Sequence, residues 1–382
     1  MGVLTRLIGA LNSAGRPGRE LGVRLDMLRS TGVRYALQRR REEERLTTLA
    51  SDPGKSAYRV IWQEAADEVG AELSVITGEF FELRANGSRA RVWRHWVPLD
   101  DAVTLRLALD KLAVHELLTE AGLPLPAHHE FDASRLDGAL DFLAQADAAC
   151  VVKPTGGASG SGTTTGVRTR DQLLRARLRG ARVSRRLLIE RQADGDMYRF
   201  LFCDGELLDA VRRRPPRVTG DGRSTIRELI AAENASRLDP AHPVSMPILR
   251  VDLDCLFALE AAGLSLRSVL PEGETVAVKT VTSQNRIEDN ETVREPVAPE
   301  LVEQARSAAA QVGVRLAGVD LITTDLSRSL KESGGVIIEV NGTPGLHYHY
   351  QVADEGNATR VAVPILRRLL EESRRELQHE GV

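Results

Sequence analysis

The chain has 382 residues, and its 51 lysines and arginines nearly balance its 54 aspartates and glutamates, for a formal net charge of −3. This balance, with 42% hydrophobic and 27% charged residues, excludes a disordered chain and a protein that mainly coats nucleic acid. No apolar run reaches the roughly 20 residues of a membrane-spanning helix. The three cysteines lie far apart and form no CxxC pair, so we expect a cytoplasmic protein without a disulfide framework.

The first 50 residues form a basic segment with ten arginines, no lysine and five acidic residues. Apolar residues recur in it at helical spacing: Leu21, Leu25, Leu28, Val33 and Leu37. We therefore predict two amphipathic helices that break near residues 30–32. This arm, residues 1–55, is expected to pack on its own chain or on a dimer partner. Contact with a membrane surface or an anionic partner is the alternative.

Beyond residue 56 the pattern changes repeatedly between helical and strand periodicity. Helices are expected over residues 58–69, 103–121, 299–312 and 361–377. Strands are expected over residues 73–77, 80–83, 90–93, 150–153, 187–190, 200–203, 207–211, 315–323 and 336–341. Asn-Gly at 86–87 and Asp-Gly at 204–205 are typical of hairpin turns. The mixture predicts a mixed α/β or α+β fold rather than a plain doubly wound sheet.

A glycine-rich loop follows a short apolar strand that ends near Lys153. Residues 155–166 contain five glycines and six hydroxyl-bearing residues. Because glycine permits positive φ and has no Cβ, such a loop brings backbone N–H groups close to phosphate oxygens. It lacks the GK[ST] and GxGxxG patterns of other nucleotide loops. We expect phosphate binding, with a flexible linker as the alternative. The proposed contacts are Lys153, Gly157, Ser159, Gly160, Ser161 and Gly162.

Three oxygen-bearing side chains occur in apolar strands near the C-terminus. Strand alternation puts Glu339 and Asn341 on one face, and Asp320 lies in the preceding predicted strand. A carboxylate in such a strand is costly unless it is paired or binds a metal. Oxygen ligands suit Mg²⁺, which usually takes one or two carboxylates and substrate phosphates. These residues therefore predict a Mg²⁺ site, and a structural salt bridge is the alternative.

Charged residues also surround the predicted strand that ends at Glu190 and Arg191. Asp196 follows after a short turn, an arrangement suited to contacts with adenine and ribose. Arg199, Arg212 and Arg213 lie on the next strands. They either reach phosphates of a nucleotide or substrate, or line an exposed strand face.

In this order the motifs resemble the ATP-grasp carboxylate–amine ligases, especially the ATP-grasp region of cyanophycin synthetase and of bifunctional bacterial glutathione synthetases. The resemblance spans about residues 109–370. It rests on residues 109–112 (LDKL), 151–154 (VVKP) with the glycine loop, 212–222 (RRRPPRVTGDG), 317–320 (AGVD) and 337–345 (IIEVNGTPG).

The resemblance implies an ATP-grasp fold, in which two α+β subdomains clamp ATP between them. A smaller α/β region is expected to precede them in the sequence. The expected divisions after the arm are residues 56–105, 106–205 and 206–382. It further implies that Lys111 and Lys153 contact phosphates, and that Asp320, Glu339 and Asn341 carry two Mg²⁺ ions, with Mn²⁺ as an alternative. The implied nucleotide contacts beyond the loop are Glu190, Arg191, Asp196 and Arg199.

In this family the γ-phosphate of ATP moves to a substrate carboxylate, and an amine then displaces phosphate from the acyl phosphate. We expect amino acids or small peptides as substrates, and a homo-oligomer, such as a dimer formed through the arm. Lys279 and Arg286 are the candidates for stabilising the acyl phosphate or steering the carboxylate, and Arg213 is a third catalytic candidate. A kinase on the same scaffold and a non-catalytic nucleotide-binding protein are the alternatives.

The sequence also departs from the relatives that it resembles. Met197 stands where they carry an acidic residue, and Val278-Lys279-Thr280 replaces an Arg-Arg-Thr segment. Cyanophycin synthesis itself is therefore not expected.

Overall fold

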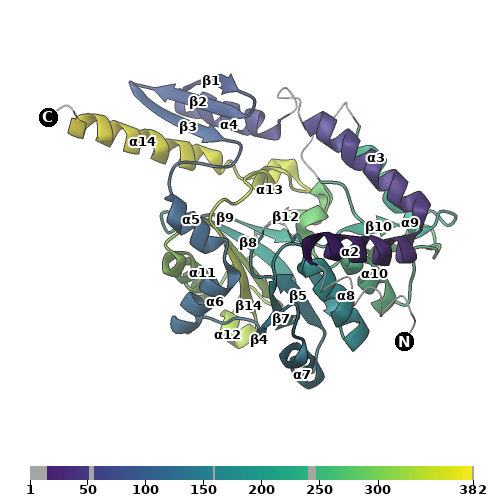
Figure 1. Cartoon of the computed structure of the whole chain (residues 1–382). Coiled ribbons are helices and arrows are strands. Elements are labelled where there is room, and N and C mark those ends of the chain that lie inside the picture. The colour runs from purple at the N-terminus through teal and green to yellow at the C-terminus, as the bar shows by residue number, and fades with distance from the viewer. Residues whose placement is uncertain (1–14, 51–55, 158–159, 240–246, 381–382) are drawn as a thin grey trace.

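The computed structural model describes residues 15–50, 56–157, 160–239 and 247–380. Four antiparallel sheets of three, two, five and four strands are joined and covered by helices (Figure 1). This confirms the expected mixed α+β class. Within the described residues, no helix is long and apolar enough to cross a membrane.

One hydrophobic core lies beside the three-stranded sheet, whose strand order is β1-β2-β3. Its elements are β1 (Glu72–Thr77), β2 (Phe80–Ala85), β3 (Ser88–Trp93), α4 (Ala57–Val69) and α14 (Ala362–Glu380). The expected hairpin is confirmed, because Asn86 and Gly87 both have positive φ (51° and 82°) in its two-residue turn. Trp62, Phe81 and Leu366 meet in this core, so the chain's last long helix packs beside its first sheet.

The four-stranded sheet has the order β4-β7-β5-β6. Its elements are β4 (His128–Asp132), β5 (Cys150–Pro154), β6 (Thr164–Val167), β7 (Arg186–Arg191), and the helices α7 (Asp137–Gln145) and α8 (Arg170–Gly180). Val152 and Ile189 face these helices in a shared core. Strand alternation therefore turns Lys153 and Glu190 to the other face.

The five-stranded sheet has the order β12-β9-β8-β13-β14. Its elements are β8 (Asp196–Cys203), β9 (Glu206–Arg213), β12 (Asn290–Thr292), β13 (Leu316–Thr323), β14 (Val336–Asn341), α6 (Lys111–Glu120) and α11 (Pro299–Val312). Asp320 opposes Glu339 whereas Leu321 opposes Ile337, so Ile338 is an extra residue in β14. Asp320 and Glu339 share one face of the sheet because they oppose each other directly, and the bulge follows this pair. The expected subdomain divisions remain a prediction, and the one after residue 205 falls in the β8–β9 turn.

The prediction of a single helix over residues 103–121 is wrong. Two helices occur instead, α5 (Ala102–Ala108) and α6. The side chain of Asp110 accepts hydrogen bonds from the backbone N–H groups of Leu112 (3.1 Å) and Ala113 (3.3 Å) and so caps α6. Apolar periodicity does not reveal this local competition between side chain and helix. The break also lets the N–H of Lys111 donate to Thr155 O at 2.8 Å, beside the glycine loop.

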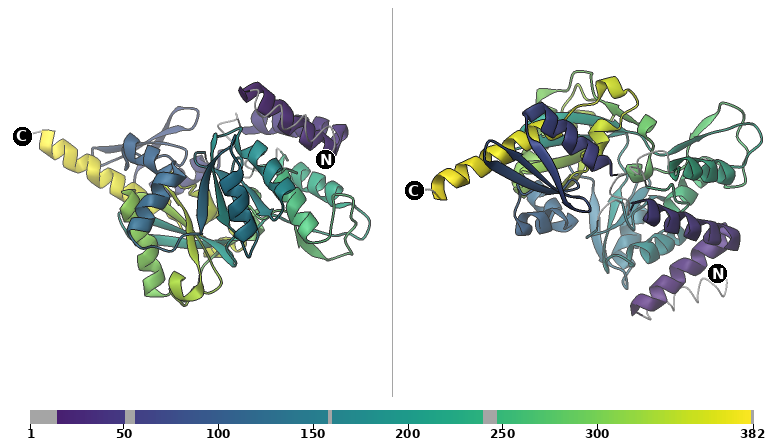
Figure 2. Two further views of the ribbon diagram at one scale, coloured as in Figure 1. Left: turned by 60° about the horizontal axis from the view of Figure 1, so that its bottom comes forward. Right: turned by 90° about the horizontal axis from the view of Figure 1, so that it is seen from above.

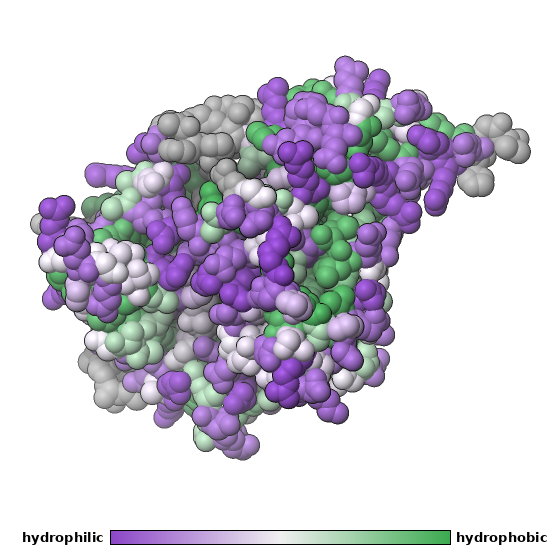
Figure 3. Space-filling model, turned by 180° about the vertical axis from the view of Figure 1, so that it is seen from behind, coloured by the Kyte–Doolittle hydropathy of each residue, from purple (hydrophilic) through white to green (hydrophobic). Residues whose placement is uncertain are grey.

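A small two-stranded sheet and the basic arm complete the structure. The elements are β10 (Arg217–Thr219), β11 (Thr275–Ala277), α9 (Ile226–Arg237), α10 (Leu253–Ala261), α2 (Gly15–Thr31) and α3 (Val33–Ala50). The arm lies on the side of the molecule opposite to the projecting helix α14 (Figures 1 and 2). Seen from behind, the surface is mainly hydrophilic, and its hydrophobic residues form separate patches (Figure 3).

The predicted break between the two arm helices is confirmed, since α2 ends at Thr31 and α3 begins at Val33. The face of the arm helices that packs on the rest of the chain differs from the apolar face predicted from the sequence. Val33 and Leu37 are 65% and 55% exposed, whereas Asp26 and Tyr35 are buried. Met27 and Tyr35 pack in two neighbouring cores, and polar contacts of the arm, which a search for apolar periodicity does not detect, add to this attachment.

Candidate functional site

The candidate site lies where the four-stranded and five-stranded sheets approach each other. Lys153 Nζ is 2.7 Å from Glu190 Oε1 on the neighbouring strand β7. The same ammonium donates to the backbone oxygen of Ile338 in β14 at 3.4 Å. Lys153 and Glu190 are only 6% and 3% exposed. A buried lysine thus connects the two sheets.

Lys111 joins the glycine loop to the other sheet. From the first turn of α6 its Nζ donates to Gly157 O at 3.2 Å and to Glu339 Oε1 at 2.8 Å. Burial acts to raise the pKa of Glu339, but the positive charges of Lys111, Lys153 and Arg199 together outweigh it, and the net shift is downward. Glu339 therefore stays a carboxylate at neutral pH.

Arg199 and Asp320 form a buried, bidentate ion pair on the same face. The two residues oppose each other in the register of β8 and β13. Arg199 Nε lies 2.7 Å from Asp320 Oδ1, and Arg199 Nη2 lies 2.6 Å from Asp320 Oδ2. Asn341 Nδ2 donates to Asp320 Oδ2 at 3.3 Å. The three oxygen-bearing residues selected from the sequence are therefore adjacent.

This donor set fits a divalent cation that also binds phosphate. Among the described residues, no cluster of three histidine, cysteine, aspartate or glutamate side chains suits a metal. Asp320, Glu339 and the amide of Asn341 supply fewer ligands than a cation needs, but Mg²⁺ usually completes its octahedron with phosphate oxygens and water. Lys111 contacts Glu339 and Lys153 contacts the backbone oxygen of Ile338, so two ammonium groups adjoin this donor set.

The glycine-rich loop has the conformation for which glycine is required. Gly157, Gly160 and Gly162 have φ values of 105°, 66° and 80°. A Cβ on Gly160 would lie 2.8 Å from Val281 Cγ1, so the loop is also too tightly packed there for a side chain. Ser161 is exposed. Ser159 lies outside the described residues.

Arg213 is a buried cation beside an aromatic ring. It is 4% exposed, and its guanidinium carbon is 3.9 Å from the ring centroid of Tyr348 in α13 (His347–Tyr350). One nitrogen donates to Thr282 O at 3.3 Å, whereas Nε has no partner in the described structure. Burial lowers the pKa of Arg213. A buried guanidinium without a carboxylate partner is suited to an anionic ligand.

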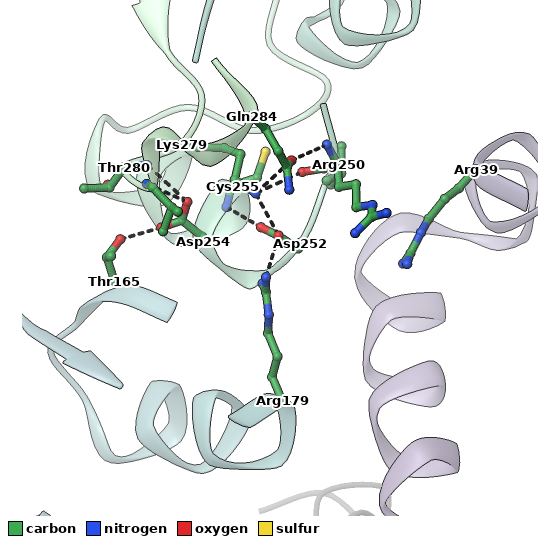
Figure 4. Close-up of polar contacts among 12 residues, drawn as sticks. Arg39, Thr165, Arg179, Arg250, Asp252, Asp254, Cys255, Lys279, Thr280 and Gln284 are labelled. Atoms are coloured by element: carbon green, nitrogen blue, oxygen red, sulfur yellow. Dashed lines mark hydrogen bonds and ion pairs between the residues drawn. The ribbon is translucent and has the colours of Figure 1, made fainter. Parts of the chain in front are cut away.

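Lys279 and Arg286 do not join this group. Lys279 is 2% exposed, and its Nζ lies 2.7 Å from Asp252 Oδ2 in a separate buried network (Figure 4). Arg286 lies 3.7 Å from Asp289 and 3.8 Å from Glu233. Their charges are thus engaged by acidic residues elsewhere in the chain.

Two expected nucleotide contacts also have other partners. Arg191 Nε lies 2.8 Å from Asp147 Oδ1, and the exposed Asp196 lies 3.5 Å from Arg212 Nε. Arg191 follows Glu190 directly, so strand alternation turns its side chain to the opposite face of β7.

Sequence reasoning missed His115 and Tyr348. His115 Nε2 lies 3.5 Å from Glu190 Oε1, and burial, with the nearby Lys153 charge, lowers the pKa of His115 to about 3. His115 follows Lys111 by four residues in the same helix, and residues at this spacing share a helix face. This spacing was a sequence signal that could have placed His115 near the site. No sequence signal relates Tyr348 to Arg213.

Known proteins similar to this chain include larger bacterial enzymes. Cyanophycin synthetase of Synechocystis sp. is 33% identical over 273 residues, which cover 69% of this chain and 30% of that protein. The bifunctional glutathione biosynthesis protein of Enterococcus faecalis is 28% identical over 317 residues, 81% of this chain and 40% of that protein. No family model matches. The chain belongs to the ATP-grasp carboxylate–amine ligase family.

The fold agrees with this family. The crystal structure of a bifunctional glutathione synthetase from Pasteurella multocida matches 79% of this chain and 42% of its own, with a TM-score of 0.50 and 21% identity. The expected ATP-grasp fold is thus confirmed. This ATP-grasp chain spans less than half the length of these relatives.

Proposed function

We propose that this chain is an ATP-dependent ligase that joins a carboxylate to an amine through an acyl phosphate. One observation supports this most directly. The ammonium of Lys111 contacts both the glycine loop, at Gly157, and the carboxylate of Glu339. A catalyst of phosphoryl transfer needs such proximity between phosphate-binding and metal-binding groups.

ATP is proposed to lie between the two sheets. Lys111 and Lys153 would neutralise its phosphates, and Gly157, Gly160 and Gly162 would cover them. Ser159 and Ser161 would add hydroxyl groups, and Glu190 would border the adenine. The positive φ values of the loop glycines and the burial of Lys153 and Glu190 support this arrangement.

Asp320, Glu339 and Asn341 are proposed to hold Mg²⁺, with two ions bound and Mn²⁺ able to replace them. The metal would neutralise negative charge on the transferred phosphoryl group. Arg199 would orient Asp320 through its bidentate pair.

Arg213 is proposed to bind the reacting carboxylate. An oxygen of that carboxylate attacks the γ-phosphorus of ATP, the bond from phosphorus to the bridging oxygen breaks, and ADP leaves. The amine then attacks the acyl carbon, loses a proton, and displaces inorganic phosphate. Positioning and charge neutralisation suffice for these steps, so no covalent enzyme intermediate is needed. Lys279 and Arg286 are now proposed to support the fold around the site.

Amino acids or small peptides are the proposed substrates, because cyanophycin synthetase and glutathione biosynthesis proteins are similar to this chain. A homo-oligomer remains part of the proposal. Leu21, Val33 and Leu37 of the arm are 48%, 65% and 55% exposed and offer an apolar contact. Light scattering on the protein as it elutes from a gel-filtration column tests for the oligomer. A monomeric mass at all concentrations would refute this part of the proposal.

Mass spectrometry tests the reaction itself. The protein is incubated with Mg²⁺-ATP and a pool of amino acids and small carboxylates. The expected product has the mass of two components minus water and forms together with ADP. Hydroxylamine should divert the reaction to a hydroxamate. A stable product heavier by one phosphate would instead identify a kinase.

A matched pair of variants assigns the role of Arg213. Arg213→Gln should abolish product formation, whereas Arg223→Gln removes an arginine whose side chain is 87% exposed and should not. Equal activity in the two variants would refute the carboxylate-binding role. No ADP formation by the unchanged chain with any pooled substrate would count against the ligase.

A further inference from the structure

The glycine loop is held between two segments that are distant in sequence. On one side, a Cβ on Gly162 would lie 3.1 Å from Val183 Cγ2 and 3.4 Å from Gly180 Cα, at the end of α8. On the other side, a Cβ on Gly160 would lie 2.8 Å from Val281 Cγ1 and 3.3 Å from Ser283 Oγ. The loop conformation therefore depends on the spacing between α8 and residues 280–283.

A buried polar network connects these two segments (Figure 4). Asp252 Oδ2 lies 2.6 Å from Arg179 Nη2, in the last turn of α8, and 2.7 Å from Lys279 Nζ. Burial would raise the pKa of Asp252, but the charges of Lys279 and Arg179 lower it overall. The carboxylate consequently stays charged and links both sides of the loop.

Asp254 makes a second connection. It is fully buried and accepts hydrogen bonds from the backbone N–H groups of Thr280 (3.2 Å) and Val281 (3.1 Å). Its other oxygen accepts from the hydroxyl of Thr165 in β6, the strand that follows the loop. One carboxylate thus joins the backbone of residues 280–281 to a side chain of the strand that follows the glycine loop.

The arm contacts each end of this network from outside. Asp26 in α2 accepts from Arg175 Nε at 3.1 Å through both of its oxygens, and Arg175 is one turn from Arg179 on α8. Tyr35 in α3 has its hydroxyl 2.8 Å from the N–H of Val251, the residue before Asp252. Asp26 and Tyr35 are 7% and 6% exposed, so both arm residues are buried, although the Arg175 side chain is 30% exposed.

We propose that the arm is an intramolecular brace, in which Asp26 and Tyr35 act as positioning residues for the glycine loop. The arm holds α8 and the segment around Val251 at one spacing, and the buried network transmits that spacing to the loop. This inference rests on the proposed function in one respect, that the loop binds ATP. It gives the arm a role within its own chain, in addition to any oligomer contact.

A braced loop binds ATP more tightly because less conformational freedom is lost on binding. Releasing the brace should therefore raise the Kd of ATP. The proposed chemistry takes place at Arg213 and the oxygen ligands of β13 and β14, to which residues 15–50 of the arm, the part that the structure describes, make no hydrogen bond or ion pair. The rate constant kcat should consequently change little while the KM for ATP rises.

The test uses the full chain with Asp26→Asn and Tyr35→Phe, singly and combined. Binding of Mg²⁺-ATP is measured by calorimetry, and hydrogen exchange of the backbone amides in residues 160–166 by mass spectrometry. The combined variant should bind ATP about tenfold more weakly and exchange faster in the loop. Asp26→Glu, which retains the charge, should recover most of the affinity. Arg40→Gln is the control, because Arg40 is exposed on α3 and its ion pair among the described residues is with Glu44 of the same helix, at 2.8 Å.

The two readouts separate failure of the brace from failure of the proposed function. Unchanged ATP affinity and unchanged loop exchange in the combined variant would overturn the brace. If the unchanged chain does not bind ATP, the proposed function fails, but faster loop exchange in the variants would still support the brace and unchanged exchange would refute it. If the combined variant does not fold, the single variants decide, since each removes one polar group.

Discussion

Asp320→Asn removes the negative charge from the most buried ion pair of the candidate site. The side chains of Arg199 and Asp320 are 8% and 2% exposed, and two hydrogen bonds join them. Asparagine has nearly the same shape and retains one acceptor oxygen. The change therefore leaves the Arg199 guanidinium buried without a counter-charge, with little change in packing.

The expected destabilisation follows from this uncompensated charge. Removing one partner of a buried ion pair typically costs about 3–5 kcal/mol, a large part of the roughly 5–15 kcal/mol that stabilises a folded protein. The double variant Arg199→Met/Asp320→Leu removes both charges and should lie within about 2 kcal/mol of the unchanged chain. Asp147→Asn is the control, because its pair with Arg191 is exposed and should contribute less than about 1 kcal/mol.

Urea unfolding followed by circular dichroism measures these free energies, and ADP release measures activity. Asp320→Asn should be the least stable variant, while both it and the double variant should be inactive. A loss below about 1 kcal/mol in Asp320→Asn would refute the assignment of a buried, energetically coupled pair. ATP turnover in the double variant would refute the metal-binding role of Asp320.

Three further predictions concern the same site. Glu339→Gln should abolish the strengthening of ATP binding by Mg²⁺ in calorimetry; an unchanged Mg²⁺ dependence would contradict its role as a ligand. Gly160→Ala places a Cβ 2.8 Å from Val281 Cγ1 at a φ of 66°. This backbone conformation alone costs about 1–2 kcal/mol for alanine. ATP affinity should therefore fall roughly tenfold, with little change in melting temperature. Folding lowers the pKa of His115 from 6.5 to about 3. Below pH 6.5 the unfolded chain therefore binds a proton that the folded chain does not. The free energy of unfolding should fall between pH 6.5 and 3 by up to about 1.4 kcal/mol per pH unit. His115→Gln should reduce this slope in urea unfolding, and an unchanged slope would refute the reasoning.

Local features of the fold were predictable from the sequence because they depend on residues close together in the chain. Asn86-Gly87 marks a hairpin since both residues tolerate positive φ. The glycines of residues 155–166 indicated a backbone that other residues rarely adopt. Strand periodicity likewise put Glu339 and Asn341 on one face. The motifs in their order were specific enough to indicate the family.

Tertiary structure alone decided which charged groups meet, because their partners come from distant segments. Lys111 and Glu339 are 228 positions apart, and Arg199 and Asp320 are 121 apart. Lys279 was expected near the reacting atoms, but its ammonium contacts Asp252. The arm shows the same limit: its apolar periodicity predicted the helices correctly but not the face that attaches them. A side chain's chemistry and local backbone preference are set by nearby residues, whereas its partner is set by how the sheets and helices pack.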